Sequence, residues 1–259
     1  MKISIITATW NSIDTISDCL ESINTQTYDL IEHIIIDGGS VDGTLIEIGN
    51  KSPKSKVVSE KDDGIYDALN KGIKLASGEV IGFLHSDDVF SSNNVVSIIA
   101  SAFENTDICA VYGDLIYVKK SDSSIVVRKW KGSKFSKIKL YLGWMPAHPT
   151  LYVRKEWYSK IGLFGTDFSI SGDYDSVLKL FSNPDFITLY IPTNFVSMRL
   201  GGVSNKFGIQ ILRKMNEDYR AVLNSGIRPV WAFCIIISKN VRKIPQYFYA
   251  KLPNSRIWN

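Results

Sequence analysis

The sequence predicts an α/β fold in which a mostly parallel sheet is flanked by helices. Apolar segments of strand length alternate with segments of helical period through residue 114. The expected strands are apolar along most of their length, which is typical of strands that are covered on both faces. The chain of 259 residues is 45% hydrophobic and 22% charged, so it can bury a core of useful size.

Each element follows from its local pattern. The segment KISIITAT is an apolar strand, and Ile13, Ile16, Cys19, Leu20 and Ile23 then recur at helical spacing. The helix GIYDALNKGIKLASG closes at a glycine, as helices often do. The expected strands are 2–9, 32–39, 55–60, 79–86 and 108–114. The expected helices are 12–23, 44–49, 64–78 and 93–103.

The pattern changes after Asp114. Residues 115–130 predict a hairpin with a polar tip, and residues 131–200 are expected to be irregular because they mix Gly, Pro and aromatics. With no repeats and no low-complexity linker, we expect one domain, residues 1–205, followed by a C-terminal helical tail, residues 206–259.

The bulk composition excludes several classes. The net charge of +4 is mild, and no basic run interleaved with aromatics indicates a nucleic-acid groove. Cys19, Cys109 and Cys234 are widely spaced, which favours a reducing compartment over a disulfide framework. The first residues are typical of a strand rather than a signal peptide, and no stretch approaches the roughly 20 apolar residues of a membrane span.

Acidic residues follow the expected strands. Asp37, Glu60 and Asp87 should meet at one edge of the sheet, because ligands of parallel sheets collect at the carboxyl ends of the strands. There Asp37 can accept from a base or ribose, and Gly38 lets the backbone approach a ligand. Asp42 is expected to cap the following helix.

The segment SEKDDGIYDALNKG is unusually acidic. One of its acids, Asp63 being the natural choice, is expected to cap the helix, while Glu60 or Asp62 is an alternative ligand-binding residue. So many carboxylates beside Asp87 and Asp88 are costly unless a cation or basic group lies among them.

The segment FLHSDD poses two alternatives. Asp87 and Asp88 follow a buried strand and precede a helix, so one carboxylate could cap that helix. The other alternative is a divalent cation site, since Mg²⁺ often binds through one or two carboxylates plus the phosphates of a substrate.

Together these pieces resemble the family 2 glycosyltransferases with a GT-A fold, in particular bacterial polysaccharide-assembly members. The matching pieces span roughly residues 1–205: SIITATWN, IIDGGSVDGT, EKDDGIYDALNKGIKLASGEVIGFLHSDD, HPTLYVRKEWYSKIGLF and SGDYDSVLKL. The resemblance implies a Rossmann-like sheet and a nucleotide-sugar donor, with UDP expected as the nucleotide.

The resemblance also implies roles for individual residues. Donor-binding residues would be Thr7, Thr9, Asp37, Asp63, Lys71, Ser86, Asp87 and Arg199. The HSDD segment is similar to the Asp-X-Asp metal motif, with Asp87 as the main carboxylate and Asp88 next to it. His85 replaces the first Asp of that motif, and imidazole suits Mn²⁺ better than Mg²⁺, so either ion is expected.

Asp173 resembles the general base of the family, although Gly172 replaces the acid that often precedes it. An inverting transfer needs one carboxylate near the acceptor hydroxyl and a separate group of ligands near the leaving diphosphate. Asp175 is expected to cap a helix that begins near Ser176.

His148 and Trp144 are the expected acceptor contacts. The alternatives are a packed histidine and a tryptophan within the core, as also holds for Trp130. Arg199, in MRLGGVSN, is expected on a loop over the diphosphate, with an ordinary turn as the alternative.

The tail suggests contact with a membrane surface. PVWAFCIII is too short to span a bilayer, but it is followed by basic and aromatic residues that suit an interface. The alternative is a helix packed on the domain or at an oligomer contact. These residues are Lys239, Arg242, Lys243, Tyr247, Phe248, Tyr249 and Lys251.

The favoured function is an inverting, metal-dependent transfer to a polyprenyl-linked or growing glycan at the cytoplasmic face of the inner membrane. A nucleotidyltransferase is one alternative, although TATWNSIDT lacks the glycines and basic residues that grip a triphosphate. A non-catalytic subunit that binds nucleotide sugars is another, favoured by His85 and opposed by Asp87 and Asp173.

Overall fold

The structure is a computed structural model that describes residues 1–200, 209–227 and 229–241. The strands are β1 (Ile3–Thr9), β2 (Ile31–Asp37), β3 (Lys56–Ser59), β4 (Val80–Phe83), β5 (Asp88–Phe90), β6 (Ala110–Lys119), β7 (Asp122–Trp130), β8 (Tyr152–Arg154) and β9 (Thr188–Arg199). The helices are α1 (Ile13–Asn24), α2 (Thr44–Lys51), α3 (Ile65–Leu75), α4 (Val95–Ala102), α5 (Lys137–Tyr141), the 3₁₀ helix η1 (His148–Thr150), α6 (Glu156–Ile161), α7 (Gly172–Ser182), α8 (Ile209–Asn224) and α9 (Pro229–Val241).

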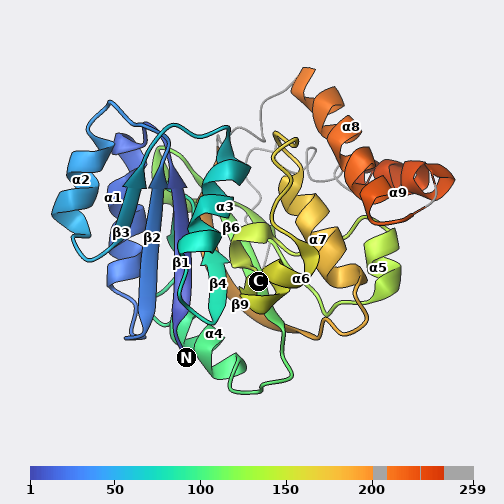
Figure 1. The fold of residues 1–259 in the computed structure, drawn as a ribbon, viewed down its shortest axis with the longest axis horizontal. Helices are drawn as coiled ribbons and strands as arrows, with labels where there is room; N and C mark the ends of the chain where they lie inside the picture. The colour runs from blue at the N-terminus through green and yellow to red at the C-terminus, as the bar shows by residue number, and fades with distance from the viewer. Residues whose placement is uncertain (201–208, 228, 242–259) are drawn as a thin grey trace.

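The predicted α/β class is confirmed. The sheet has the order β3-β2-β1-β4-β8-β6-β9-β5, with β7 paired to β6 outside this path. The first four strands are parallel, and their carboxyl ends point to the top of Figure 1. Because these strands are parallel, the loops that follow them lie at the same edge of the sheet.

The other half of the sheet is mixed. Strand β8 runs antiparallel to β4 and to β6, whereas β9 runs parallel to β6 and pairs antiparallel with β5. The predicted hairpin is confirmed as β6 and β7, with Lys119 opposite Asp122.

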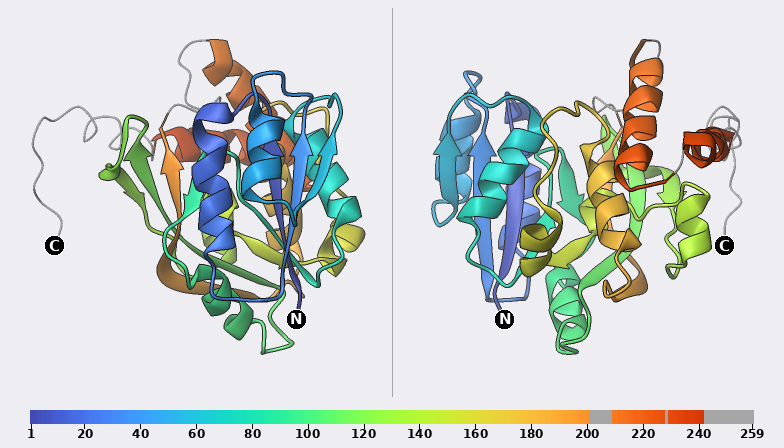
Figure 2. Two further views of the ribbon diagram at one scale, coloured as in Figure 1. Left: turned by 90° about the vertical axis from the view of Figure 1, so that its left-hand side faces the viewer. Right: turned by 45° about the vertical axis from the view of Figure 1, so that its right-hand side comes forward.

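Helices cover both faces of the sheet, as Figures 1 and 2 show. On one face Ile6 and Phe83 pack against α3, α6 and α7, and on the other Ile5 and Val80 pack against α1 and α4. Neighbouring residues of β1 enter different clusters because successive side chains point to opposite faces of a strand. At Gly82 a β-carbon would lie 2.1 Å from the ring of Tyr152, so only glycine fits there.

Three local predictions are wrong. Residues 131–200 are not irregular, because besides the helix expected near Ser176 they include the 12-residue strand β9 and the helix α6. Neither Asp87 nor Asp88 caps the following helix, whose N-cap is Asn94, and Asp88 instead begins β5, which pairs with β9. Helix α7 begins at Gly172 with Ser171 as its N-cap, so Asp175 lies inside the first turn and forms an ion pair with Lys179 instead of capping the helix.

The tail is helical where the structure describes it. Helices α8 and α9 pack with α7 and α5 in the same core cluster, and Ser238 donates a hydrogen bond to the carbonyl of Leu142. Within residues 1–200, 209–227 and 229–241, no helix combines the length and the apolar character that a bilayer crossing requires. The predicted boundary at 205/206 and the segment 242–259 lie outside the described residues.

Candidate functional site

The loops after β1 and β2 are fastened to each other. Asn11 has a φ of +47°, an uncommon conformation for a residue other than glycine, and its side-chain carbonyl accepts the N–H of Val41. The N–H of Asn11 in turn donates to Ser40 Oγ at 2.7 Å. These bonds fix the backbone at the carboxyl edge of the sheet before any ligand arrives.

Asp37 organises the same edge from inside. Its side chain is fully buried, and Oδ2 accepts the N–H groups of Gly39 and Ser40 at 3.1 and 3.0 Å and the hydroxyl of Ser59 at 2.6 Å. Its Oδ1 accepts the hydroxyl of Ser40. Because these oxygens already bond to the protein, the turn itself depends on Asp37, and the contact with a nucleoside stays a prediction.

The two threonines of β1 differ. The buried Thr7 hydroxyl forms a hydrogen bond of 3.0 Å with Nε2 of His33, inside the domain. The buried Thr9 hydroxyl has no hydrogen-bond partner within the described part of the chain. Since an unpaired buried hydroxyl is unfavourable, Thr9 is the better candidate for a donor contact.

Asp62, rather than Asp63, lies beside the end of β2. A β-carbon on Gly38 would meet Asp62 Oδ2 at 2.7 Å and the Trp10 ring at 3.5 Å. Asp63 is exposed, and the N-cap of α3 is Gly64. Helix capping by Asp63 is therefore wrong, whereas its contact with a nucleoside remains untested.

Trp10 was not singled out from the sequence. Its side chain is 67% exposed although it directly follows a buried strand. An exposed tryptophan next to a carboxylate at the ligand-binding edge offers a flat apolar face for a base. The signal that could have found it is the position, one residue beyond an apolar strand.

Lys71 is the basic group among the acids of this region. Its ammonium group lies 2.8 Å from Glu60 and 3.2 Å from Asp67, and its hydrogen bond with Glu60 raises the pKa of Lys71. Lys71 thus supplies a basic group for Glu60 and Asp67, which is one of the two alternatives that the sequence left open. A direct contact between Lys71 and a donor stays a prediction.

The segment His85–Asp88 divides between two environments. Ser86 is buried, and its hydroxyl lies 3.0 Å from the hydroxyl of Ser12. Asp87 is partly exposed. Asp88 is fully buried, both of its oxygens lack a hydrogen-bond partner among the described residues, and burial raises its pKa well above the usual value.

Asp88 interacts electrostatically with Asp87 and with Arg199. The guanidinium of Arg199 forms an ion pair with Asp18 on α1. The predicted role of Arg199 at a diphosphate therefore has no support in this arrangement and remains a prediction. The role of Asp88 as a metal ligand beside Asp87 stays a prediction.

Asp173 lies in the first turn of α7 and is partly exposed. Its Oδ1 accepts the N–H of Tyr174 at 2.7 Å. A β-carbon on Gly172 would lie 2.9 Å from three ring carbons of Tyr66. The glycine that replaces the expected acid is thus required by the close approach of Tyr66.

His148 is buried between aromatic rings. It stacks on Phe83 with a centroid distance of 5.1 Å and meets Phe164 edge-on at 5.6 Å. Burial lowers its pKa to about 4, while the charge of Asp173 opposes that shift. The packed alternative is observed, and contact with an acceptor stays a prediction.

Four side chains from distant segments meet here. His85 interacts electrostatically with Asp87, Asp173 and His148, although burial is the larger effect and lowers the pKa of His85. These side chains come from the end of β4, the start of α7 and η1. Ring contacts join the same segments, because Phe83 stacks on His148, His148 meets Phe164, and Gly172 lies against the Tyr66 ring, which stacks on Phe164. The paired-carboxylate hypothesis requires such a juxtaposition of the segments that hold Asp87 and Asp173.

Trp144 lies in an aromatic cluster instead. Its ring centroid is 5.8 Å from Tyr112, 6.2 Å from Phe135 and 6.0 Å from Phe181. This is the packing alternative, and nothing here tests a contact with an acceptor.

The donor atoms around Asp87 decide whether a divalent cation fits this site. In the described ranges, no group of three or more His, Cys, Asp and Glu side chains is arranged to hold a metal ion. Asp87 is the accessible carboxylate of the motif, and Nδ1 of His85 is buried with no hydrogen-bond partner in the part of the chain that the structure describes. One carboxylate suits an ion that is held mainly by the phosphates of a donor.

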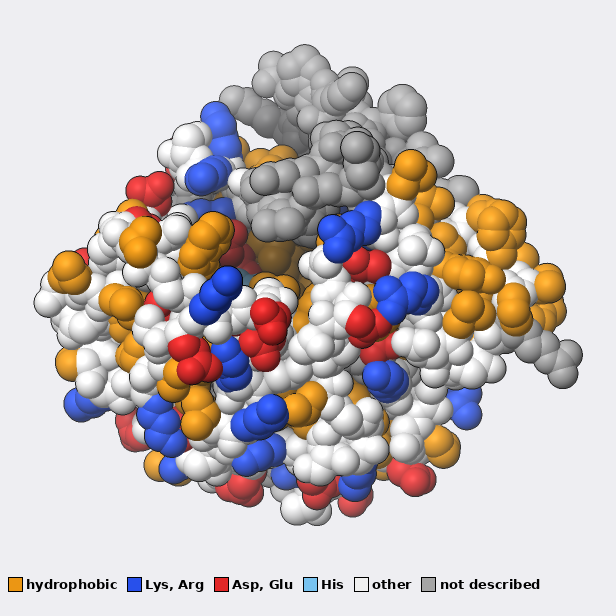
Figure 3. All heavy atoms as spheres, turned by 45° about the horizontal axis from the view of Figure 1, so that its top comes forward, with side chains coloured by type: hydrophobic (Ala, Val, Ile, Leu, Met, Phe, Trp, Pro, Cys, Tyr) orange, Lys and Arg blue, Asp and Glu red, His pale blue; other side chains and the backbone are white. Residues whose placement is uncertain are grey.

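Figure 3 looks onto the edge toward which the parallel strands point, and the surface is hollowed near its centre.

The sequence matches a family model described as glycosyl transferase family 2 over residues 4–162. A PGL/p-HBAD biosynthesis glycosyltransferase of Mycobacterium bovis is 30% identical over 208 residues, which cover 78% of each chain.

Solved structures share the fold. The S. aureus TarS 1–349 complex with UDP-GlcNAc superposes with a TM-score of 0.68 at 16% identity, covering 95% of this chain and 73% of that one. The mannosyltransferase PcManGT from Pyrobaculum calidifontis, with GDP-Man and Mn²⁺, gives 0.64 at 16%, covering 96% and 72%. The chain covers 44% of a longer TarS chain.

Proposed function

Because the chain belongs to glycosyl transferase family 2, we propose that it is an inverting, metal-dependent hexosyltransferase that uses a nucleotide-sugar donor. UDP is the proposed nucleotide, and a polyprenyl-linked or growing glycan of a bacterial surface polysaccharide is the proposed acceptor. The observation that carries the proposal is that the segments before Asp87 and around Asp173 pack together: Phe83 stacks on His148, His148 meets Phe164, and Gly172 lies against the Tyr66 ring, which stacks on Phe164.

The donor end is the carboxyl edge of β1 and β2. There the exposed ring of Trp10 can stack on the base, and the Asp62 carboxylate beside it can accept from base or ribose donors. Thr9 supplies a further hydroxyl. The loops are already fastened through Asn11 and Asp37, so little ordering is needed on binding.

The diphosphate end lies at Asp87. Asp87 would hold Mn²⁺ or Mg²⁺ together with the donor phosphates, and His85 is the second candidate ligand. When bound, such an ion offsets the charge that builds on the leaving diphosphate. The PcManGT complex with Mn²⁺ supports this use of a divalent ion.

The acceptor end lies at Asp173. As general base, its carboxylate would take the proton of the acceptor hydroxyl while that oxygen forms a bond to the anomeric carbon and the bond to the diphosphate breaks. The partly exposed position of Asp173 leaves it open to an acceptor. His148 lies close enough to interact with its charge.

A membrane-facing surface is part of the proposal. We define the α5/α9 surface by its exposed apolar side chains, whose exposed fractions reach 74% at Val230 and 73% at Ile138. Figure 3 shows apolar side chains gathered at the right, over α9. The members are Ile138, Tyr141, Leu142, Val230, Trp231, Phe233 and Ile237.

Charge selects a lipid surface as the partner of the α5/α9 surface. Lys134 and Lys137 are exposed beside its α5 part, which suits anionic headgroups at a cytoplasmic membrane face. Lys239 does not contribute, because it is buried and pairs with Asp218 at 3.0 Å. The other tail residues proposed for this role, from Arg242 onward, lie outside the described residues.

A transfer assay tests the enzymatic part. Purified protein is incubated with a panel of UDP- and GDP-sugars and a polyprenyl-diphosphate saccharide, with Mn²⁺, with Mg²⁺ and with EDTA. We expect metal-dependent release of the nucleoside diphosphate and an inverted anomeric configuration in the product by NMR. Retained configuration, or turnover that EDTA leaves unchanged, would contradict the proposal, and pyrophosphate release from a triphosphate would favour a nucleotidyltransferase.

Vesicle flotation tests the membrane part. The protein should float with vesicles containing anionic phospholipid and less with neutral vesicles, and Trp231→Ser with Phe233→Ser should abolish flotation. Ile46→Ser, on the exposed face of α2, is the matched control. Equal flotation of wild type and double variant would contradict a lipid role for the α5/α9 surface.

A further inference from the structure

The loop before α7 is held by a carboxylate from the C-terminal part of the chain. Glu217 on α8 is only 3% exposed, and its carboxylate accepts three consecutive backbone N–H groups. The shortest distances from Oε atoms are 3.1 Å to Ser169, 2.8 Å to Ile170 and 3.0 Å to Ser171. Successive N–H groups that point to one place form an anion-binding concavity, and here an internal carboxylate fills it.

This loop leads directly into the candidate base. Ser171 is the N-cap of α7, and Asp173 follows two residues later in the first turn. The N–H groups at the start of a helix have no partner within the helix, so an outside acceptor must satisfy them. Glu217 does so for Ser171 and extends the same contact to the two residues before it.

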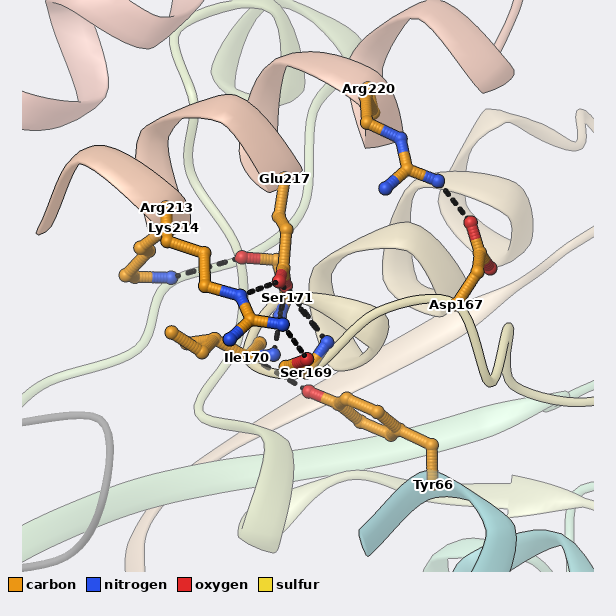
Figure 4. A network of polar contacts seen from close by, with 9 residues as sticks. All are labelled: Tyr66, Asp167, Ser169, Ile170, Ser171, Arg213, Lys214, Glu217 and Arg220. Atoms are coloured by element: carbon orange, nitrogen blue, oxygen red, sulfur yellow. Dashed lines mark hydrogen bonds and ion pairs between the residues drawn. The ribbon is translucent and has the colours of Figure 1, made fainter. Parts of the chain in front are cut away.

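Three further side chains brace the loop, as Figure 4 shows, and one of them is Lys214, whose ammonium group donates to Ser171 Oγ at 3.4 Å. From the opposite side, Tyr66 on α3 donates its hydroxyl to the carbonyl of Ile170 at 2.7 Å. Arg213 donates to Ser169 Oγ at 2.7 Å and lies 3.4 Å from Glu217. The loop is thus clamped between the first half of the chain and α8.

The clamp sets the position of Asp173. Gly172 rests against the ring of Tyr66, so a shift of the loop moves the first turn of α7 against that ring. A general base must lie within hydrogen-bond reach of the acceptor proton, and a displacement of about 1 Å can lower a rate by roughly 100-fold.

We propose that Glu217 is a positioning residue for the transfer reaction, acting through the 169–171 loop on Asp173. This inference rests on the proposed function of Asp173 as the base. It also makes α8 a part of the active site, whereas the sequence suggested an appendage.

The test is Glu217→Gln, which keeps the shape and one acceptor oxygen but loses the charge. We expect kcat to fall about 10- to 100-fold, while KM for the donor and the Kd for the nucleoside diphosphate change less than about threefold because the donor end is held by other residues. Glu217→Ala should lower kcat further. Hydrogen exchange should show faster exchange at the amides of 169–171 in both variants.

Glu32→Gln is the matched control. Glu32 also accepts a backbone N–H, that of Ser77 at 2.7 Å, together with the hydroxyls of Ser4 and Ser77. It lies at the amino end of β2, opposite the candidate site. Its removal should lower stability but leave kcat per folded molecule unchanged, with the folded fraction measured by urea titration.

The outcomes separate the two proposals. If the wild type is active and the kcat of Glu217→Gln lies within about twofold of the wild-type kcat, the positioning role is overturned. The same holds if Glu32→Gln loses as much kcat as Glu217→Gln. A Glu217→Gln variant that loses nucleotide affinity as strongly as kcat overturns it as well. A wild type that transfers no sugar from any donor overturns the proposed function itself, and the positioning role with it.

Discussion

Asp37 and Glu217 each hold a loop at the candidate site by accepting backbone N–H groups, but they reach those groups over very different lengths of chain. Asp37 bonds to N–H groups two and three residues further on, whereas Glu217 bonds to groups 46 to 48 residues earlier. The donor end of the site is therefore held by contacts among residues 11–59, whereas the acceptor end depends on the packing of α8 against α7. The difference suggests that damage to the first anchor affects folding, while damage to the second affects turnover.

The largest effect is expected for Asp37→Ala. It removes the acceptor of the Gly39 and Ser40 N–H groups and of the Ser59 hydroxyl, at a cost of about 3 kcal/mol of unfolding free energy, since a hydrogen bond to a charged group contributes roughly 1–2 kcal/mol. Urea unfolding should show this loss, and nucleotide binding should disappear with it. Asp42→Ala, which removes an exposed carboxylate that accepts from Thr44 and Ile13, is the control and should cost less. A stable Asp37→Ala variant that still binds nucleotide would contradict the claim that Asp37 is needed for folding of the donor end.

A buried histidine in the first 60 residues makes the stability of the fold sensitive to acid. His33 is buried between the hydroxyls of Thr7 and Ser55, and burial lowers its pKa from 6.5 to about 3. Below pH 6.5 the unfolded chain binds a proton that the folded chain does not bind until about pH 3, so stability falls as the pH falls through that window.

Between pH 6.5 and pH 4.5 the loss from His33 amounts to about 2–3 kcal/mol. Urea titrations at these two pH values should show a smaller loss in His33→Gln than in the wild type. Equal losses in both proteins would mean that His33 is accessible to protons in the folded state.

Two glycines sharpen the comparison further. The β-carbon added by Gly38→Ala would clash with the Asp62 carboxylate, and the one added by Gly172→Ala would clash with the Tyr66 ring. Each contact costs about 1–3 kcal/mol where the neighbour cannot move. We expect Gly38→Ala to weaken nucleotide binding about tenfold and Gly172→Ala to lower kcat about tenfold, as calorimetry and initial rates can measure. If Gly38→Ala lowered kcat and Gly172→Ala weakened nucleotide binding instead, the separation of the site into a donor end and an acceptor end would be contradicted.

The smallest effect is expected for Arg220→Ala. Arg220 pairs with Asp167 and lies over the Phe168 ring, close to the clamped loop, but both charged groups are exposed. Such pairs contribute less than about 1 kcal/mol. A kcat close to that of the wild type would show that the loop does not depend on the Arg220–Asp167 ion pair, whereas a loss like that of Glu217→Gln would contradict this.

The same contrast between local and distant contacts decided what the sequence could predict. Apart from the short strand β5, the order of elements through β6 follows from periods within each segment, and the structure confirms it. Strand β9 was missed because Pro192 and polar residues interrupt its apolar pattern, and the pairing with β6 shifts register between Tyr190 and Asn194 at this point.

The candidate site shows the same limit. Convergence of Asp87 and Asp173 was predicted from motifs, whereas the different environments of Asp87 and Asp88 follow from Asp88 entering β5, which the sequence did not reveal. Trp10 and Asp62 are adjacent only through the turn at Gly38. Glu217 gave no signal at all, since its partners are backbone groups in a distant loop.

The most direct test of the account is the turnover of Asp173→Asn with a nucleotide sugar that the wild type uses. As the base is lost while the donor end stays intact, kcat should fall about 10²- to 10⁴-fold, with nucleotide affinity unchanged. Asp185→Asn, on an exposed loop after α7, should behave like the wild type. Near-normal turnover by Asp173→Asn would contradict the claim that this carboxylate takes the acceptor proton.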